Sequence, residues 1–194
     1  MRTSRLFRQL AWRGLRANRD VFMPYLAALT LVVALFNMLA SLVDNAYVRS
    51  NGASLVTLLG LGAVVIGLFS AAFVTYARRF LDGRRVRELA VYSVLGLEKR
   101  QIALVLLWET LWVAGAALLG GLVLAALFGN LAFMALNALM RLPVQLGYVF
   151  SWPVTLITVG LFGGLSLLLW AWQVARLSLS TPVGQLTAQR AGER

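Results

Sequence analysis

Four long apolar stretches alternate with short polar segments along the chain. Each stretch is close to the ~20 apolar residues that a helix needs in order to cross a bilayer. The spans are expected at about residues 21–43, 54–76, 102–131 and 152–174. The pattern therefore predicts an all-α integral membrane protein whose four transmembrane helices form one domain over residues 21–176.

The composition supports this class and removes several chemistries. Of the 194 residues, 60% are hydrophobic and 13% charged, whereas soluble domains have about 45–50% and about 25%. The chain has no cysteine and no histidine, which excludes disulfides, thiol nucleophiles and the usual Cys/His metal sites. It also has no GxxxxGK[ST] run for binding ATP phosphates. We expect no catalysis, no cofactor and no metal in this chain.

The net charge of +11 is arranged for a membrane rather than for nucleic acid, because the basic residues flank the apolar stretches. Most of them lie in the N-terminal segment, in the loop after the second span and in the tail 177–194. Arg49 and Arg141 fall on the other side. Basic residues are retained in the cytoplasm, so both termini and the central loop are expected to be cytoplasmic in a bacterial cell membrane.

The N-terminal segment, residues 1–20, has the pattern of an amphipathic helix. Its arginines fall on one side at helical spacing, whereas Leu6, Phe7, Leu10 and Gly14 face the other way. This pattern predicts a basic interfacial, or elbow, helix against anionic lipid. The alternative is a disordered basic tail that only sets topology.

The segment between spans two and three, residues 78–102, is basic yet patterned like a helix. Gly83 and Gly96 bracket twelve residues whose apolar members, such as Leu89 and Ala90, share one face. Such a helix is too apolar for bare cytosol and too short and charged to span, so it requires a lipid surface or a protein groove. Alternatively, its arginines only obey the positive-inside rule.

The run "RRVRELAVYSVLGLEKRQI", followed by Glu109 in "LLWETLWVAG", resembles the FtsX-like permeases of ABC transporters. Within that family it is similar to the N-terminal half of bacitracin-export-type permeases, as are the basic opening and the short first outer loop. The tail "STPVGQL" resembles the family's "NPxxLL" ending, with Thr181 in place of the Asn.

The resemblance implies that the 78–102 segment is a coupling helix that docks on a cytoplasmic ABC ATPase dimer. It also implies a second transmembrane half and, as a further partner, a sensor kinase. The function implied is export or removal of a peptide antibiotic or lipid-linked substrate. The alternative is a non-transporting subunit that signals to an outer hydrolase or a kinase. The implied docking residues are Arg84, Arg85, Arg87, Glu88, Leu89, Ala90, Tyr92, Leu95 and Gly96.

Glu109 is the only acid within a predicted span. A charge at mid-membrane costs about 2.5–3.5 kcal/mol on insertion scales, so Glu109 is expected to face protein. It either pairs with Arg78 or Arg79 at the end of span two or serves as a protonatable carboxyl on a transport path. Its shallow depth favours the structural pair.

Small residues four apart mark candidate packing faces, because they let helix backbones approach closely. Gly160 and Gly164 form such a pair in the fourth span, and Ala117 and Gly121 form one in the third. Packing within the four-helix unit is the favoured interpretation, ahead of a subunit interface.

Overall fold

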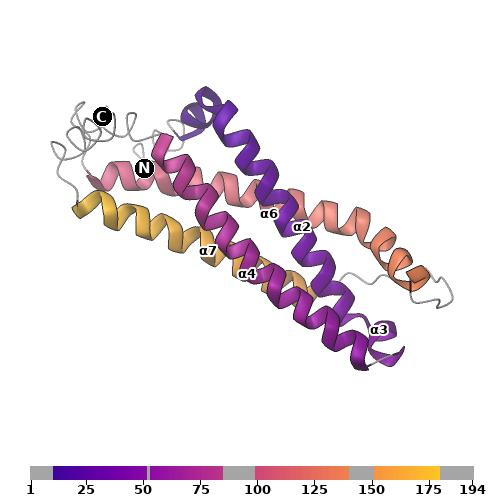
Figure 1. The fold of residues 1–194 in the computed structure, drawn as a ribbon. Helices are drawn as coiled ribbons and strands as arrows, with labels where there is room; N and C mark the ends of the chain where they lie inside the picture. Colours follow the sequence, from indigo (N-terminus) through magenta and orange to yellow (C-terminus); the bar gives the residue numbers. More distant parts are fainter. Residues whose placement is uncertain (1–10, 52, 85–98, 140–150, 180–194) are drawn as a thin grey trace, which may run out of the picture.

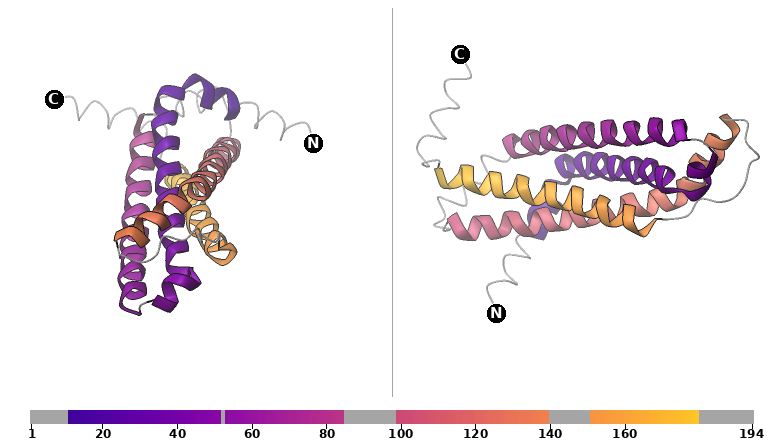
Figure 2. Two further views of the ribbon diagram at one scale, coloured as in Figure 1. Left: turned by 90° about the vertical axis from the view of Figure 1, so that its right-hand side faces the viewer. Right: turned by 90° about the horizontal axis from the view of Figure 1, so that it is seen from below.

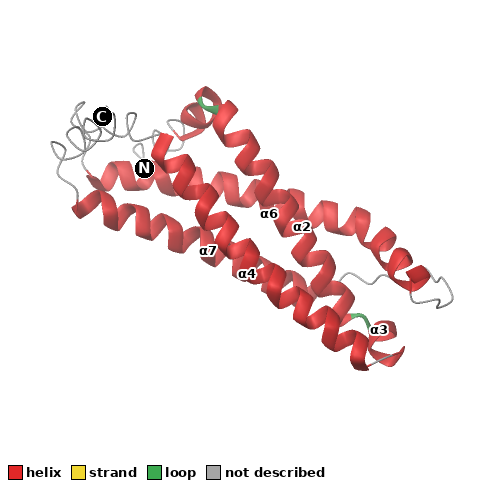
Figure 3. Ribbon diagram, viewed as in Figure 1, coloured by secondary structure: helices red, strands yellow, loops and turns green. Residues whose placement is uncertain are grey.

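The computed structural model describes residues 11–51, 53–84, 99–139 and 151–179. Within these ranges the chain is almost entirely helical and has no strand, as Figure 3 shows. Because backbone groups find no hydrogen-bond partner in lipid, a spanning segment must satisfy them internally, and the helix does so.

Four long helices form the bundle: α2 (Arg19–Asp44), α4 (Ala53–Arg84), α6 (Lys99–Leu139) and α7 (Trp152–Leu179). A short helix, α3 (Ala46–Asn51), follows α2. Each of the four long helices contains a stretch long and apolar enough to cross a membrane. The predicted fold class, an all-α protein with four spans, is therefore confirmed.

Helix α4 continues through Gly83 without a break, as far as Arg84. A glycine inside a helix costs only about 1 kcal/mol relative to alanine, and an Arg78–Asp82 ion pair at (i, i+4) supports the same turn. Arg84, assigned to the coupling helix, thus belongs to α4.

The helices lie side by side in an elongated bundle (Figure 1, Figure 2). The start of α2, the end of α4, the start of α6 and the end of α7 lie together at one end of the bundle, which we call the basic end. Helix α3 and the start of α7 lie at the other end, which we call the opposite end (Figure 2). The predicted topology places the basic end at the cytoplasm.

Helix α2 forms the centre of the bundle and packs against α6, α4 and α7. Its inward face presents Phe22, Tyr25, Leu29, Val33 and Phe36, all buried and spaced three or four residues apart. By contrast, α4 leaves most of its apolar side chains exposed within this chain. In a bilayer such a face meets lipid or another transmembrane helix.

The closest helix contact joins α6 to α2. Ala117 is fully buried, and a Cβ atom added to Gly121 would stand 2.6 Å from Val33 Cγ1 and 2.9 Å from the Thr30 carbonyl oxygen. Small residues at 117, 121, 125 and 129 continue this buried stripe along α6. Glycine is therefore required at position 121 for the two helices to approach this closely.

The glycine pair in α7 differs from the Ala117–Gly121 pair in α6. Gly160 is exposed and Gly164 is half-buried, and a Cβ atom at either position would meet nothing within 4 Å. Among the described residues, no neighbouring helix approaches these two glycines closely. Their role in packing stays a prediction.

Candidate functional site

A buried arginine lies near the basic end of α4. Arg78 is only 5% exposed, although a guanidinium inside a membrane segment normally requires protein partners. Its Nη2 donates hydrogen bonds to Thr110 Oγ1 of α6 at 2.9 Å and to Gln173 Oε1 of α7 at 3.3 Å. Its Nε lies 3.4 Å from Asp82 Oδ1, one turn further along α4.

Gln173 closes the network from the other side. It accepts from Arg78 and donates from Nε2 to Asp82 Oδ1 at 3.0 Å. Thr110 Oγ1 in turn donates to the Leu106 carbonyl oxygen within α6. We call Arg78, Asp82, Thr110 and Gln173 the Arg78 cluster. It joins α4, α6 and α7 at the basic end through charge-assisted contacts, which are stronger than neutral ones.

A small cavity adjoins this cluster. It is lined by Tyr25 and Leu29 of α2, Arg78 of α4, Thr110 of α6 and Ser166 of α7, among others. Its size suits about one water molecule. All four spanning helices therefore meet at this point, and the space is too small for an organic substrate.

Glu109 lies next to the cluster on α6. It is 2% exposed, and the neighbouring Thr110 receives the Arg78 hydrogen bond. The expectation that Glu109 faces protein agrees with this burial. Arg78 forms its ion pair with Asp82, and Arg79 is exposed. The pairing of Glu109 with either arginine stays a prediction, as does its use on a transport path.

Helix α7 makes a second polar contact at mid-bundle. Asn37 Nδ2 of α2 donates to Thr158 Oγ1 of α7 at 3.0 Å, and both side chains are fully buried. Phe36 and Phe162, from the same two helices, meet edge to face with centroids 5.6 Å apart. This contact orients α7 against α2 at the level of the apolar core.

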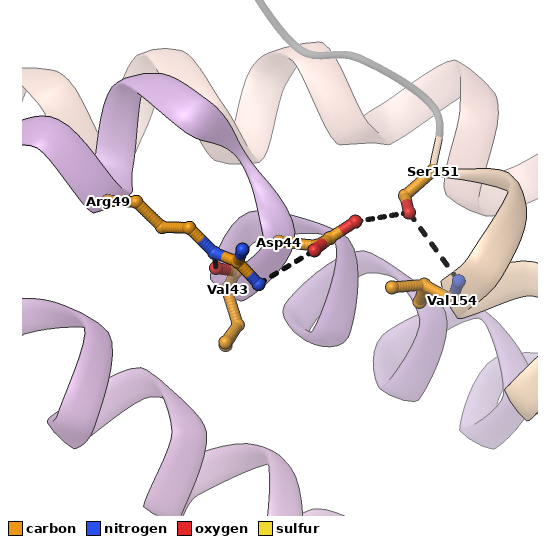
Figure 4. Close-up of polar contacts among 5 residues, drawn as sticks. All are labelled: Val43, Asp44, Arg49, Ser151 and Val154. Carbon is orange, nitrogen blue, oxygen red and sulfur yellow. Dashed lines mark hydrogen bonds and ion pairs between the residues drawn. The ribbon is translucent and has the colours of Figure 1, made fainter.

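A third polar contact lies at the opposite end, where Asp44 accepts from two directions (Figure 4). Arg49 Nη2 donates to Asp44 Oδ1 at 2.8 Å, and Ser151 Oγ donates to Oδ2 at 2.5 Å. Arg49 Nε also donates to the Val43 carbonyl oxygen, and the Val154 amide lies 3.5 Å from Ser151 Oγ. The end of α2, the α3 segment and the start of α7 are thus held together.

The N-terminal segment is described from residue 11 onward. Residues 11–17 are helical, and the Trp12 ring meets Trp112 of α6 with centroids 5.6 Å apart. The Arg16 guanidinium lies over the Trp12 ring at 5.6 Å, a cation–π contact. Binding of this segment to anionic lipid stays a prediction.

The docking residues implied by the resemblance fall mostly outside the described residues. Arg84 ends α4, whereas the stretch from residue 85 to residue 98, which includes all the others, is not described. α4 and α6 are the two helices on either side of that stretch. The described part of the chain contains no group of three His, Cys, Asp or Glu side chains that could hold a metal ion.

Sequence reasoning missed the Arg78 cluster because it considered Arg78 only as a topology-setting arginine and as one of two candidate partners for Glu109. The interacting residues are 32 and 95 positions away along the chain. The usable local signal was Asp82, four residues after Arg78, together with a lone amide, Gln173, near the end of the fourth apolar stretch.

Four apolar helices joined by buried polar contacts define a multi-pass integral membrane protein. Residues 63–182, more than half of the sequence, match the FtsX-like permease C-terminal family. The chain belongs to the FtsX-like permease family, which confirms the family that the 78–102 motif indicated.

A curated relative agrees with this assignment. The chain is 26% identical over 149 residues to the uncharacterized ABC transporter permease YvcS of Bacillus subtilis (strain 168). The match includes 73% of this chain and 22% of the relative, so the chain corresponds to a small part of that protein's length. The narrower similarity to bacitracin-export-type permeases stays a prediction.

Proposed function

We propose that this chain is a transmembrane permease part of an ABC transporter. In this function it hydrolyses no ATP itself and converts hydrolysis by a separate cytoplasmic ABC ATPase dimer into movement of its helices. The observation that supports this most is the family match over residues 63–182, which includes the whole basic segment between α4 and α6.

The docking surface we propose is the stretch from Arg84 to Gly96. It follows directly from α4 and leads into α6, so a force applied there acts on two spanning helices. Its apolar positions, among them Leu89 and Tyr92, suit a groove on the ATPase. The arginines around them suit acidic groups at the rim of that groove, where charge complementarity speeds association.

We further propose a second transmembrane half as partner, either a continuation of the chain, a second copy or a sibling permease. An added Cβ at Gly160 or Gly164 of α7 would meet nothing within 4 Å, so another helix could approach closely there. The N-terminal helix is proposed to bind anionic lipid through exposed arginines such as Arg13 and Arg16.

For substrate, the resemblance to bacitracin-export-type permeases favours export or removal of a peptide antibiotic or a lipid-linked compound. This assigns the protein to antimicrobial peptide resistance, with a sensor kinase as a further partner. Both termini are proposed to be cytoplasmic, because the basic end contains most of the arginines.

The test is purification of the tagged chain from its native membranes in mild detergent, with mass spectrometry of the proteins that co-purify. We expect a P-loop ATPase in stable proportion. Leu89→Asp and Tyr92→Asp place charges in the docking face and should abolish that association. The matched control is Arg79→Gln, at an exposed position before the docking stretch.

An ATPase that is absent from the unsubstituted chain, or that is retained by both aspartate variants, would refute docking at this stretch. Growth of the native host with each variant in the presence of cell-wall peptide antibiotics tests the substrate class. Unchanged sensitivity with ATPase association lost would favour the non-transporting function.

A further inference from the structure

The Arg78 cluster marks one level of the bundle near its basic end. Arg78 of α4 donates to Thr110 of α6 at 2.9 Å and to Gln173 of α7 at 3.3 Å. These three positions therefore lie at about the same depth along the bundle. Because a helix rises about 1.5 Å per residue, neighbouring positions on each helix can be placed relative to this level.

Exposed aromatic side chains gather at this level. Tyr76 of α4, Trp112 of α6 and Trp172 of α7 are exposed, and each lies within two residues of a member of the cluster. Since α4 and α7 end at the basic end and α6 begins there, all three aromatics lie on the side of the cluster nearer the middle of the bundle. The offset is at most about 3 Å. Trp12 of the N-terminal helix joins them, because its ring contacts Trp112 with centroids 5.6 Å apart.

Exposed arginines lie one helical turn from two of these aromatic side chains. Arg176 follows Trp172 by four residues on α7, towards the basic end, and Arg16 follows Trp12 by four residues. The Arg16 guanidinium stands over the Trp12 ring. Residues at this spacing share one face of a helix. An amphipathic ring at the membrane interface with a cation beside it fits the headgroup of an anionic phospholipid.

The exposure of α6 changes at the same level. Before Thr110, Leu104 is the one exposed large apolar side chain of this helix, and it is only 37% exposed. From Leu111 onward such side chains recur, and Leu119 and Leu127 are 70% and 65% exposed. An exposed apolar surface of this kind requires lipid around it. Helix α6 therefore passes from a protein-covered part into a lipid-facing part beside the cluster.

The opposite end of the bundle has an exposed aromatic side chain but a different charge arrangement. Trp152, at the start of α7, is exposed. Arg49 is the cation that the described part of the chain places at that end, and it donates to Asp44 Oδ1 at 2.8 Å. Its charge is thus matched within the protein. Among the described residues, attraction for anionic lipid is confined to the basic end.

We propose that the exposed aromatic and basic side chains at the level of the cluster form an interfacial belt that binds anionic phospholipid headgroups: Trp12, Arg16, Tyr76, Trp112, Trp172 and Arg176. The belt places the boundary of the hydrocarbon core at the Arg78 cluster. Arg78 and Asp82 then lie at headgroup depth, where a charge costs far less than at the bilayer centre. The proposal extends the lipid contact of the N-terminal helix to α4, α6 and α7, and it does not depend on docking of an ATPase.

The depth of the belt is measured by spin-label accessibility in the full chain. Because the chain has no native cysteine, single labels are introduced directly at Leu168→Cys and Ala175→Cys, exposed positions on either side of Trp172. In vesicles of phosphatidylethanolamine and phosphatidylglycerol, we expect the label at 168 to respond to oxygen and the label at 175 to a water-soluble nickel chelate. A label at 175 that responds only to oxygen, or a label at 168 that responds to the chelate, would overturn the boundary.

Headgroup selectivity is measured by native mass spectrometry of the purified full chain with added phosphatidylglycerol or phosphatidylcholine. We expect the unsubstituted chain to bind phosphatidylglycerol preferentially. Arg176→Gln should weaken that binding about fivefold, the effect of one arginine near an anionic surface, and should leave phosphatidylcholine binding unchanged. Arg49→Gln removes the same charge at the opposite end and is the matched control.

The aromatic contribution has its own pair of variants. Trp172→Leu removes the indole ring but keeps an apolar side chain, so it should weaken phosphatidylglycerol binding, whereas Trp152→Leu should not. The substituted positions are exposed, and thermal unfolding midpoints check that the variants fold. Equal binding of the two lipids by the unsubstituted chain would overturn the proposal. An effect of Arg176→Gln or Trp172→Leu no larger than that of its control would also overturn it, whether or not an ATPase co-purifies.

Discussion

Gly121 of α6 and Val33 of α2 are so close that a Cβ atom on the glycine would stand 2.6 Å from Val33 Cγ1. Such a distance is far below ordinary carbon–carbon contact. Val33 is fully buried, and the same Cβ atom would stand 2.9 Å from the Thr30 carbonyl oxygen. Helices α2 and α6 are therefore closely packed at this point.

Gly121→Ala should push α6 away from α2. Overpacking of this kind typically costs about 1–3 kcal/mol, and we expect a lower thermal unfolding midpoint in detergent. Gly160→Ala is the matched control, because a Cβ there meets nothing within 4 Å. The close-packing account fails if both variants unfold at the same temperature as the unsubstituted protein.

Arg78→Met should destabilise the bundle, whereas Arg79→Met should be nearly neutral. Arg78 is buried and contacts three side chains, but Arg79 is exposed on the next position of the same helix. Hydrogen bonds to charged groups contribute about 1.5–3 kcal/mol each. Asp82 keeps partial contact with solvent, which reduces the loss, so we expect about 2–3 kcal/mol. Equal unfolding midpoints for the two variants would contradict the burial.

The Asn37–Thr158 contact should show a modest coupling energy. Hydrogen bonds between transmembrane helices average about 0.6 kcal/mol, with a maximum near 1.7 kcal/mol, in double-mutant cycles. We expect a value in that range from Asn37→Leu, Thr158→Val and the double variant, measured by unfolding in detergent. Strict additivity of the two single effects would show that the 3.0 Å contact contributes nothing.

The proposed orientation predicts which of two positions, one just before α2 and one just after it, reacts with a membrane-impermeant maleimide in intact cells. Ala17→Cys and Ala46→Cys both replace exposed alanines and leave every charge in place. Position 46, at the opposite end, should label from outside. Position 17, at the basic end, should label only after permeabilisation. The reverse pattern would invert the topology and place the docking stretch outside the cell.

The four helices and the family were predictable because each depends on local information. Length and apolarity define a span, and the run from Arg84 to Ile102 is a contiguous motif. The bracketing glycine at position 83 does not interrupt α4, since a single glycine disfavours a helix by only about 1 kcal/mol. The local (i, i+4) ion pair between Arg78 and Asp82 supports the helix just before it.

The parts that were missed depend on contacts between distant residues. Gly121 and Gly160 occupy the same kind of motif, yet one lies against Val33 and the other faces outward. Spacing alone gives both the same expectation. Likewise, Arg78 resembles its neighbour Arg79 in sequence, and only the positions of Thr110 and Gln173 distinguish a buried arginine from an exposed one.

The most direct test of ATPase docking is a photocrosslink from the docking stretch. Benzoylphenylalanine is placed at Tyr92 or, as a control, at Phe69, an exposed position in the middle of α4. After irradiation of native membranes, we expect position 92 to crosslink to a P-loop ATPase and position 69 to crosslink to none. Absence of an ATPase crosslink from position 92, with the chain expressed and inserted, would contradict docking at this segment.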